Sequence, residues 1–131
     1  MKITNTFDVP LPPAEAWATL MDIEGIVTCV PGAELVEVVD DRTYKGKVSV
    51  KLGPVALSFL GTAKFVEIDE AARVAVVKAQ GADQKGRGGA NASVRFGLTP
   101  ADGGTRVVVD TDLSLSGSVA QYGRAAGMIE T

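Results

Sequence analysis

Side chains capable of chemistry are few in this 131-residue chain, which has no histidine. It therefore lacks the group that most often serves as general acid, general base or metal ligand. The single cysteine, Cys29, has no imidazole to activate it, and we expect a small buried apolar side chain there. The carboxylates are scattered over predicted turns, without metal-ligand spacing or an acid–base pair. We therefore predict no catalytic residue and no metal site, which favours a binding protein over an enzyme.

Two polar side chains are expected beside apolar ones. Tyr122 lies on a predicted C-terminal helix, where its ring either packs in the core or offers a hydroxyl to a ligand carbonyl. Asn5 lies on the apolar side of the predicted first strand and is the second candidate. Hydrogen bonds of this kind orient a ligand but do not transform it.

The strands predicted to position these groups carry small residues on their apolar side. Apolar residues alternate with polar ones in two runs, which is typical of a sheet with one apolar face. The two apolar sets are Leu57, Phe59, Gly61, Ala63, Phe65 and Ala90, Ala92, Val94, Phe96, Leu98. Aromatic residues make up only 5% of the chain and glycine occurs 15 times, so a curved sheet of this composition predicts a hollow interior.

The remaining pattern gives one α+β domain over residues 1–131. A first strand is followed by two short helices, the first carrying Trp17 and the second capped by Asp22. A parity change at Phe65-Val66 predicts a bulge. Strands are expected at 34–39, 43–52, 55–68, 73–79, 90–99 and 106–115, with a mobile loop over 81–89 and a terminal helix still running at 131. Short turns between consecutive strands indicate an antiparallel sheet, with the first strand able to pair with the last.

Charge and composition exclude several classes of function. The net charge of −3 argues against nucleic acid binding, which needs a basic face. There is no signal-peptide core or apolar run of membrane-spanning length, and a lone cysteine suits a cytoplasmic protein. The outer sheet face is expected to hold Lys45, Lys47, Lys51 and Lys64. Solubility is the favoured interpretation of these lysines, and docking to an acidic partner is the alternative.

Several motifs resemble one family across nearly the whole chain. The matching stretches are Trp17 to Gly32 with Cys29-Val30-Pro31-Gly32, Tyr44 to Val48 running to Leu52-Gly53-Pro54, Phe59 with Gly61-Thr62-Ala63, Gly104 to Val107, and Gly117 to Arg124. Together they resemble the CoxG family, the G subunits of carbon monoxide dehydrogenase, within the START-like (SRPBCC) superfamily. The resemblance implies a helix-grip fold, in which about seven curved antiparallel strands wrap around a C-terminal helix, with two short helices after the first strand.

The resemblance also implies a role and partners. The family accompanies CO dehydrogenase-type molybdenum hydroxylases and is implicated in holding them at the inner face of the cytoplasmic membrane. Family members usually continue into a tail beyond the terminal helix, whereas this chain stops at Thr131. We expect a cytoplasmic accessory protein with a peripheral membrane contact made by that tail.

Such a hydroxylase must pass its electrons onward, and the membrane acceptor is a lipid-soluble quinone. From this role, without a direct motif, we predict that the cavity carries a quinone, either menaquinone or ubiquinone. The expected ligand-binding residues are Ile26, Val30, Pro31, Val48, Val50, Leu57, Phe59, Ala63, Ala92, Val94, Phe96, Val119, Tyr122, Ala126 and Ile129. The alternatives are a carrier of another apolar molecule, a START-like cyclase or hydrolase, and an assembly chaperone.

Overall fold

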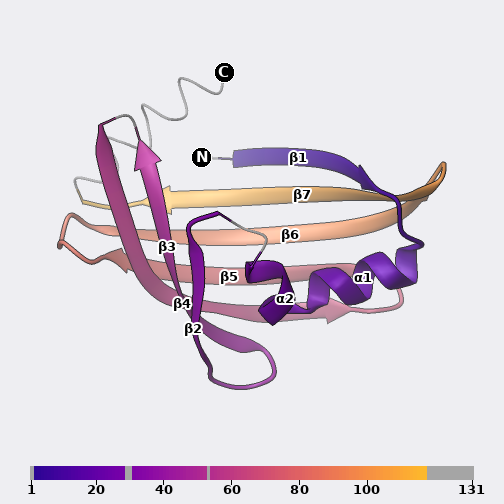
Figure 1. Cartoon of the computed structure of the whole chain (residues 1–131), viewed down its shortest axis with the longest axis horizontal. Helices are drawn as coiled ribbons and strands as arrows, with labels where there is room; N and C mark the ends of the chain where they lie inside the picture. The colour runs from indigo at the N-terminus through magenta and orange to yellow at the C-terminus, as the bar shows by residue number, and fades with distance from the viewer. Residues whose placement is uncertain (1, 29–30, 53, 118–131) are drawn as a thin grey trace.

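The computed structural model describes residues 2–28, 31–52 and 54–117, which form one curved sheet and two short helices (Figure 1). The elements, in chain order, are β1 Lys2–Val9, α1 Pro13–Met21, α2 Ile23–Val27, β2 Ala33–Val38, β3 Thr43–Leu52, β4 Val55–Asp69, β5 Val74–Asp83, β6 Gly89–Ala101 and β7 Gly104–Leu115. All neighbouring strands are antiparallel, in the order β1-β7-β6-β5-β4-β3-β2.

Pairing and register follow the sequence pattern closely. The first strand pairs with the last, Phe7 lying opposite Val107. The register between β4 and β5 shifts between Phe65 and Glu67, which confirms the predicted bulge. The bulge moves the side chains that follow it by one position, so Ile68 remains on the same apolar face as Phe65.

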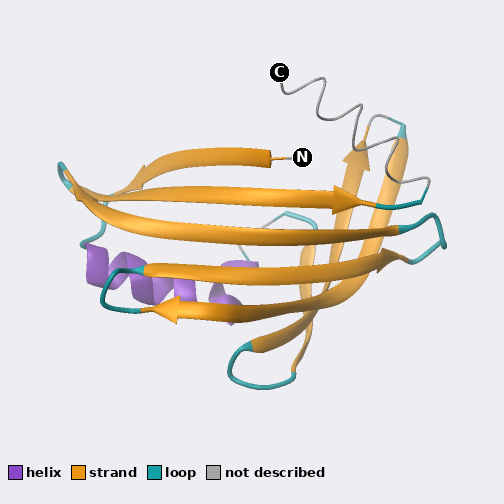
Figure 2. Ribbon diagram, turned by 180° about the vertical axis from the view of Figure 1, so that it is seen from behind, coloured by secondary structure: helices purple, strands orange, loops and turns teal. Residues whose placement is uncertain are grey.

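The sheet bends sharply along β4, so that β2 and β3 run across the direction of the other strands (Figures 1 and 2). Gly61 pairs with Gly81 of β5 near this bend. A Cβ placed on Gly61 would lie 2.0 Å from the backbone oxygen of Gln80. Because Gly61 has no side chain, the two backbones can approach closely. Glycine at this position thus has a steric role, in addition to the hollow interior that the sequence predicts.

Both helices lie on the same side of the sheet (Figure 2). Helix α1 begins at Pro13, whose fixed backbone angle suits the first turn of a helix. The Asp22 carboxylate accepts a hydrogen bond from the Gly25 amide at 3.3 Å, which confirms the predicted cap of α2. The second helix is short and ends at Val27.

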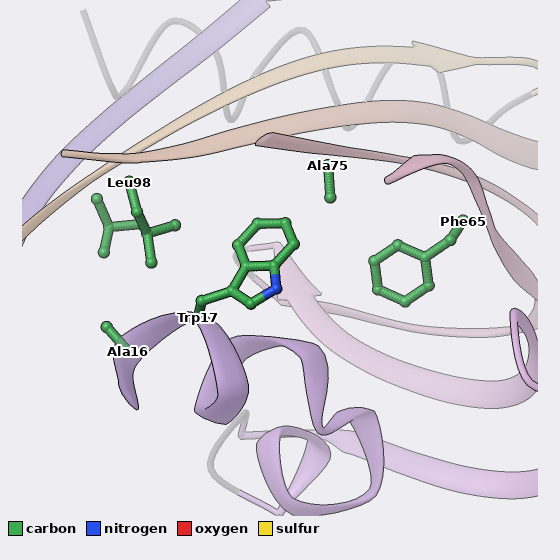
Figure 3. Packing of buried hydrophobic residues seen from close by; sticks show 6 residues of the cluster. Ala16, Trp17, Phe65, Ala75 and Leu98 are labelled. Atoms are coloured by element: carbon green, nitrogen blue, oxygen red, sulfur yellow. The ribbon is translucent and has the colours of Figure 1, made fainter. Parts of the chain in front are cut away.

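The core lies where α1 packs on the sheet. Trp17 projects from α1 towards the sheet between Leu98 and Phe65 (Figure 3), and only 7% of it is exposed. Its ring centroid is 6.1 Å from that of Phe96. Isolated helices of this length are unstable in water, so α1 depends on its packing against the sheet. Burial of Trp17 supplies much of that stabilisation.

Two predictions need correction or remain outside the described residues. The fifth strand does not end at Ala79, and residues 81–89 are not a loop: β5 continues to Asp83 and β6 begins at Gly89. The pairing of Gly81 with Ala90 continues the ladder through this glycine-rich stretch, which the lack of bulky side chains had suggested was irregular. The predicted C-terminal helix falls on residues 118–131, outside the described residues.

Candidate functional site

The inner face of the sheet, on which the helices pack, has two unlike ends. At one end, large side chains surround Trp17, and Ala75 and Val107 are fully buried. At the other end, small residues lie opposite one another on three neighbouring strands. We call this group the small-residue patch; it comprises Ala63, Ala79, Gly81, Ala90 and Ala92. Each of its members is half-buried.

Aliphatic and aromatic side chains border the small-residue patch. Leu57 is buried, with 3% of its surface exposed, while Phe59 and Val94 are half-buried. Phe59 pairs with Val48 on β3, and Val94 pairs with Val77 on β5. The sequence-predicted residues Leu57, Phe59, Ala63, Ala92 and Val94 thus share one apolar face, as period-2 alternation requires.

The predicted mouth is formed by elements at the edge of the sheet. Ile26 is half-buried on α2, and Pro31 is exposed in the connection that leads to β2. Val48 on β3 is 42% exposed although its strand position faces inward, which is unusual for a valine in a closed core. Val50 pairs with Leu57. Val30, Val119, Tyr122, Ala126 and Ile129 lie outside the described residues.

Phe96 belongs to the packed end of the inner face. Its ring contacts Trp17 and, at 6.5 Å between centroids, Phe65. The first contact is tilted and the second is edge-on, and aromatic rings favour such arrangements over face-to-face stacking. Phe96 therefore belongs to the aromatic cluster next to the small-residue patch, and its ring packs against other side chains of the protein. Asn5 is exposed on β1, opposite Val109.

Tyr44 is an inward-facing polar group that the sequence analysis did not select. It lies opposite Ala63, its ring packs edge-on against Phe65, and its hydroxyl donates to the Asp41 carbonyl at 3.3 Å. Burial, followed by nearby carboxylates, raises the pKa of this phenol. Its parity with Val48 and Gly46 was the available signal, since all three share one side of β3.

A buried ion pair closes the far end of β5. Asp83 is 4% exposed, and its carboxylate accepts hydrogen bonds from the Arg87 guanidinium at 2.7 and 3.1 Å. It also accepts from the backbone amides of Arg87 and Ser58. The Arg87 side chain in turn donates to the Ala56 carbonyl at 2.9 Å. Chiefly through the Arg87 hydrogen bonds, the pKa of Asp83 is held far below its usual range.

This ion pair takes over the hydrogen bonding to β4 where β5 ends. Beyond Asp83 the main chain turns away from β4, yet β4 still has backbone groups to satisfy at Ala56 and Ser58. The two charged side chains and the Gln84 amide bond to those groups. The turn over 84–88 is thus tied to β4 beside Leu57, rather than being the mobile loop expected from its glycines.

Neither metal ligation nor membrane crossing is indicated in the described ranges. Within residues 2–28, 31–52 and 54–117, no three His, Cys, Asp or Glu side chains are placed to hold a metal ion. The helices of that same part of the chain are too short or too polar to span a membrane.

The fold is shared with several solved structures. A conserved protein from Geobacillus kaustophilus has a TM-score of 0.83 at 21% identity, over 99% of this chain and 85% of that one. The Zhui aromatase/cyclase from Streptomyces sp. R1128 has a TM-score of 0.65 at 18% identity, over 99% and 82%. The protein TTHA0849 from Thermus thermophilus has a TM-score of 0.67 at 16% identity, over 99% and 84%. Identities this low establish the fold alone.

This chain shares with these structures a fold of one curved antiparallel sheet and two short helices. Its family follows from a match, over residues 6–126, to the family model that describes CoxG, the G subunit of carbon monoxide dehydrogenase. The chain belongs to that family, as its motifs had indicated. A search of curated proteins finds no match.

Proposed function

We propose that this chain is a non-enzymatic accessory protein of a CO dehydrogenase-type molybdenum hydroxylase, and that it carries a quinone between that enzyme and the membrane. The family supports the choice of partner. The single observation that supports the carrier role is the small-residue patch, which lies beside a tightly packed aromatic end of the same sheet face. A sheet face with large packed side chains at one end and small residues at the other suits an apolar ligand.

The proposed ligand is retained by burial of its tail. An isoprenoid tail that buries about 300 Å² of apolar surface gains up to about 7 kcal/mol before the cost of association. The proposed slot runs along Leu57, Phe59, Ala63, Ala92 and Val94, and its mouth lies at Ile26, Val30 and Pro31. Val50 and Phe96 border the slot, and Val119, Ala126 and Ile129 of the predicted helix face it. Tyr122 is the proposed partner of a ring carbonyl.

Chemical transformation of the ligand is not part of the proposal. The chain has no histidine, and among the described residues the buried carboxylate of Asp83 is already occupied by an arginine and two backbone amides. A START-like cyclase would need a free acid or base at the guest. Replacement of Cys29 by serine should therefore leave ligand binding and support of the partner enzyme unchanged, and a selective loss of function would show that the thiol takes part.

Docking to the hydroxylase is proposed for the outer face of β3. Lys45, Lys47 and Lys51 alternate along this strand, and Lys45 lies 3.9 Å from Glu37 in an exposed ion pair. Charge reversal of all three lysines should weaken co-purification with the hydroxylase, and more so at low salt, because salt of 0.1 M screens exposed charges over about 10 Å. Unchanged co-purification at low salt would exclude this strand as the docking site.

Native mass spectrometry of the purified protein, followed by solvent extraction, tests the carrier role directly. We expect a bound species whose mass and absorption are those of a quinone. Extraction of fatty acids alone would support a general lipid carrier, and a protein without any bound lipid, unable to take up added quinone, would support an assembly role instead. Membrane linkage by a tail beyond residue 131 is also part of the proposal, as the resemblance to the family implies.

A further inference from the structure

The outer face of the sheet carries a groove that the carrier role does not use. Its volume is about 510 Å³, and it runs across β4, β5, β6 and β7 on the side opposite Trp17. Most of the residues that line it are polar, among them Lys64, Lys78, Gln80, Asn91 and Ser93, and Val66, Ala79 and Ala92 contribute apolar surface. Amide and hydroxyl groups of this kind donate hydrogen bonds to carboxylates. The two lysines and the amide and hydroxyl groups therefore offer an anionic guest several donors, beside the apolar surface of Val66.

Two lysines lie directly opposite each other in this groove. Lys64 of β4 pairs with Lys78 of β5, which brings their Cβ atoms to within about 4.5–5.5 Å. Like charges in this arrangement repel, so an anion between them gains from both. No carboxylate of the described residues lies within 4.0 Å of either ammonium group.

The carboxylate nearest to the pair in the strand register is that of Glu67, which pairs with Val76 and so lies diagonally from Lys78 at about 7–8 Å, beyond ion-pair distance. Asp112 lines the groove two strands away from Lys78, which corresponds to about 10 Å. Asp40, in the turn before β3, feels the charge of Lys64, but its pKa is lowered mainly by hydrogen bonds from Arg42 and Thr43. A local excess of positive charge thus remains on a protein whose net charge is −3.

We propose that this groove binds an acidic peptide segment of a partner protein, with a glutamate or aspartate carboxylate held between Lys64 and Lys78. Recognition through charge complementarity steers association and selects the partner. A flat anionic membrane fits the groove less well, because its headgroups would have to enter a recess while the acidic remainder of the protein is repelled. The proposal concerns a face opposite the carrier cavity, so it stands or falls independently of the quinone.

Binding of a fluorescent octaglutamate peptide to the full chain tests the proposal, with octaglutamine as the uncharged control. Fluorescence anisotropy at low salt gives the affinity, and amide NMR shifts locate the site. We expect shifts at Thr62, Gln80 and Ser93, and Lys78→Glu should weaken binding at least 10-fold. Lys85→Glu is the matched control: it changes the same charge on an exposed turn outside the groove and should weaken binding less than 2-fold.

Three results would overturn the proposal. Equal losses for the two variants would mean that the peptide senses only net charge, and shifts confined to another surface would place binding elsewhere. Vesicles of phosphatidylglycerol that bind in a Lys78-dependent manner, when the peptide does not, would make the groove a membrane contact. Quinone uptake by Lys78→Glu should match that of the parent protein, so failure of the groove and failure of the carrier role can be told apart.

Discussion

Replacement of Ala92 by phenylalanine distinguishes an interior that can accept a guest from one that is already full. Ala92 belongs to the small-residue patch and is half-buried on β6. Ala75, on the same face of the neighbouring strand β5, is 0% exposed and packs in the core with Trp17 and Phe65. The two positions share residue type, strand geometry and side of the sheet, so Ala75→Phe is the matched control for Ala92→Phe.

The magnitudes follow from packing. Forcing a larger side chain into a filled core costs about 1–3 kcal/mol. For a domain of 131 residues this corresponds to a loss of about 4–12 °C in Tm. We expect that loss, or misfolding, for Ala75→Phe. Ala92→Phe should change Tm by less than about 4 °C, because its ring enters the space that the proposed ligand would fill.

Thermal unfolding and ligand titration measure the two consequences. Ala92→Phe, and likewise Ala63→Phe, should retain the fold while quinone uptake is lost. If Ala92→Phe lowers Tm as much as Ala75→Phe does, and the parent protein binds no ligand, then the small-residue patch is part of a solid core and the reasoning from residue size is refuted.

Two further predictions concern backbone approach and the buried ion pair. Gly61→Ala should destabilise the protein by about 1–3 kcal/mol in urea unfolding, because its Cβ would meet the Gln80 oxygen at 2.0 Å. Gly97→Ala is the control and should be neutral or slightly stabilising, because its Cβ would make an ordinary contact of 3.6 Å with the Val74 side chain. Equal effects of the two substitutions would contradict the steric explanation. Arg87→Met should destabilise the protein at pH 7, because it removes the partner of the Asp83 carboxylate. The pKa of Asp83 is lower in the folded than in the unfolded state. The stability that this carboxylate contributes is therefore present above the unfolded pKa of about 3.9 and is lost as the pH falls towards the folded pKa. The stability difference between parent and variant should therefore narrow below about pH 4, and a difference that is constant from pH 7 to pH 2 would contradict the assignment.

Strand alternation and turn residues were sufficient to predict most of the fold. Thr43–Leu52 was predicted with its observed ends, and the parity change at Phe65-Val66 located the bulge, because both signals are local. The extension of β5 to Asp83 could not be predicted in this way. It depends on Arg87, Ser58 and Ala56 meeting in space, and those contacts join residues up to 31 positions apart.

The inner face was predictable in its parity but not in its division into two ends. Alternation shows that Phe96 and Ala92 face the same way. It does not show that Phe96 is covered by Trp17, because that contact depends on how α1 crosses the sheet. The outer groove has the same origin: Lys64 and Lys78 become neighbours only through the register of β4 with β5.

The most direct test of the carrier role is a titration of the protein with quinones of short and long tail, compared with a fatty acid of equal apolar area. We predict that the long-tailed quinone binds most tightly, that the short-tailed one binds more weakly because it buries less apolar surface, and that the fatty acid binds less well than the long-tailed quinone because it lacks the ring and its carbonyls. Tyr122→Phe should weaken quinone binding by only several-fold. Equal or tighter binding of the fatty acid would contradict quinone carriage and make the protein a general carrier of apolar molecules.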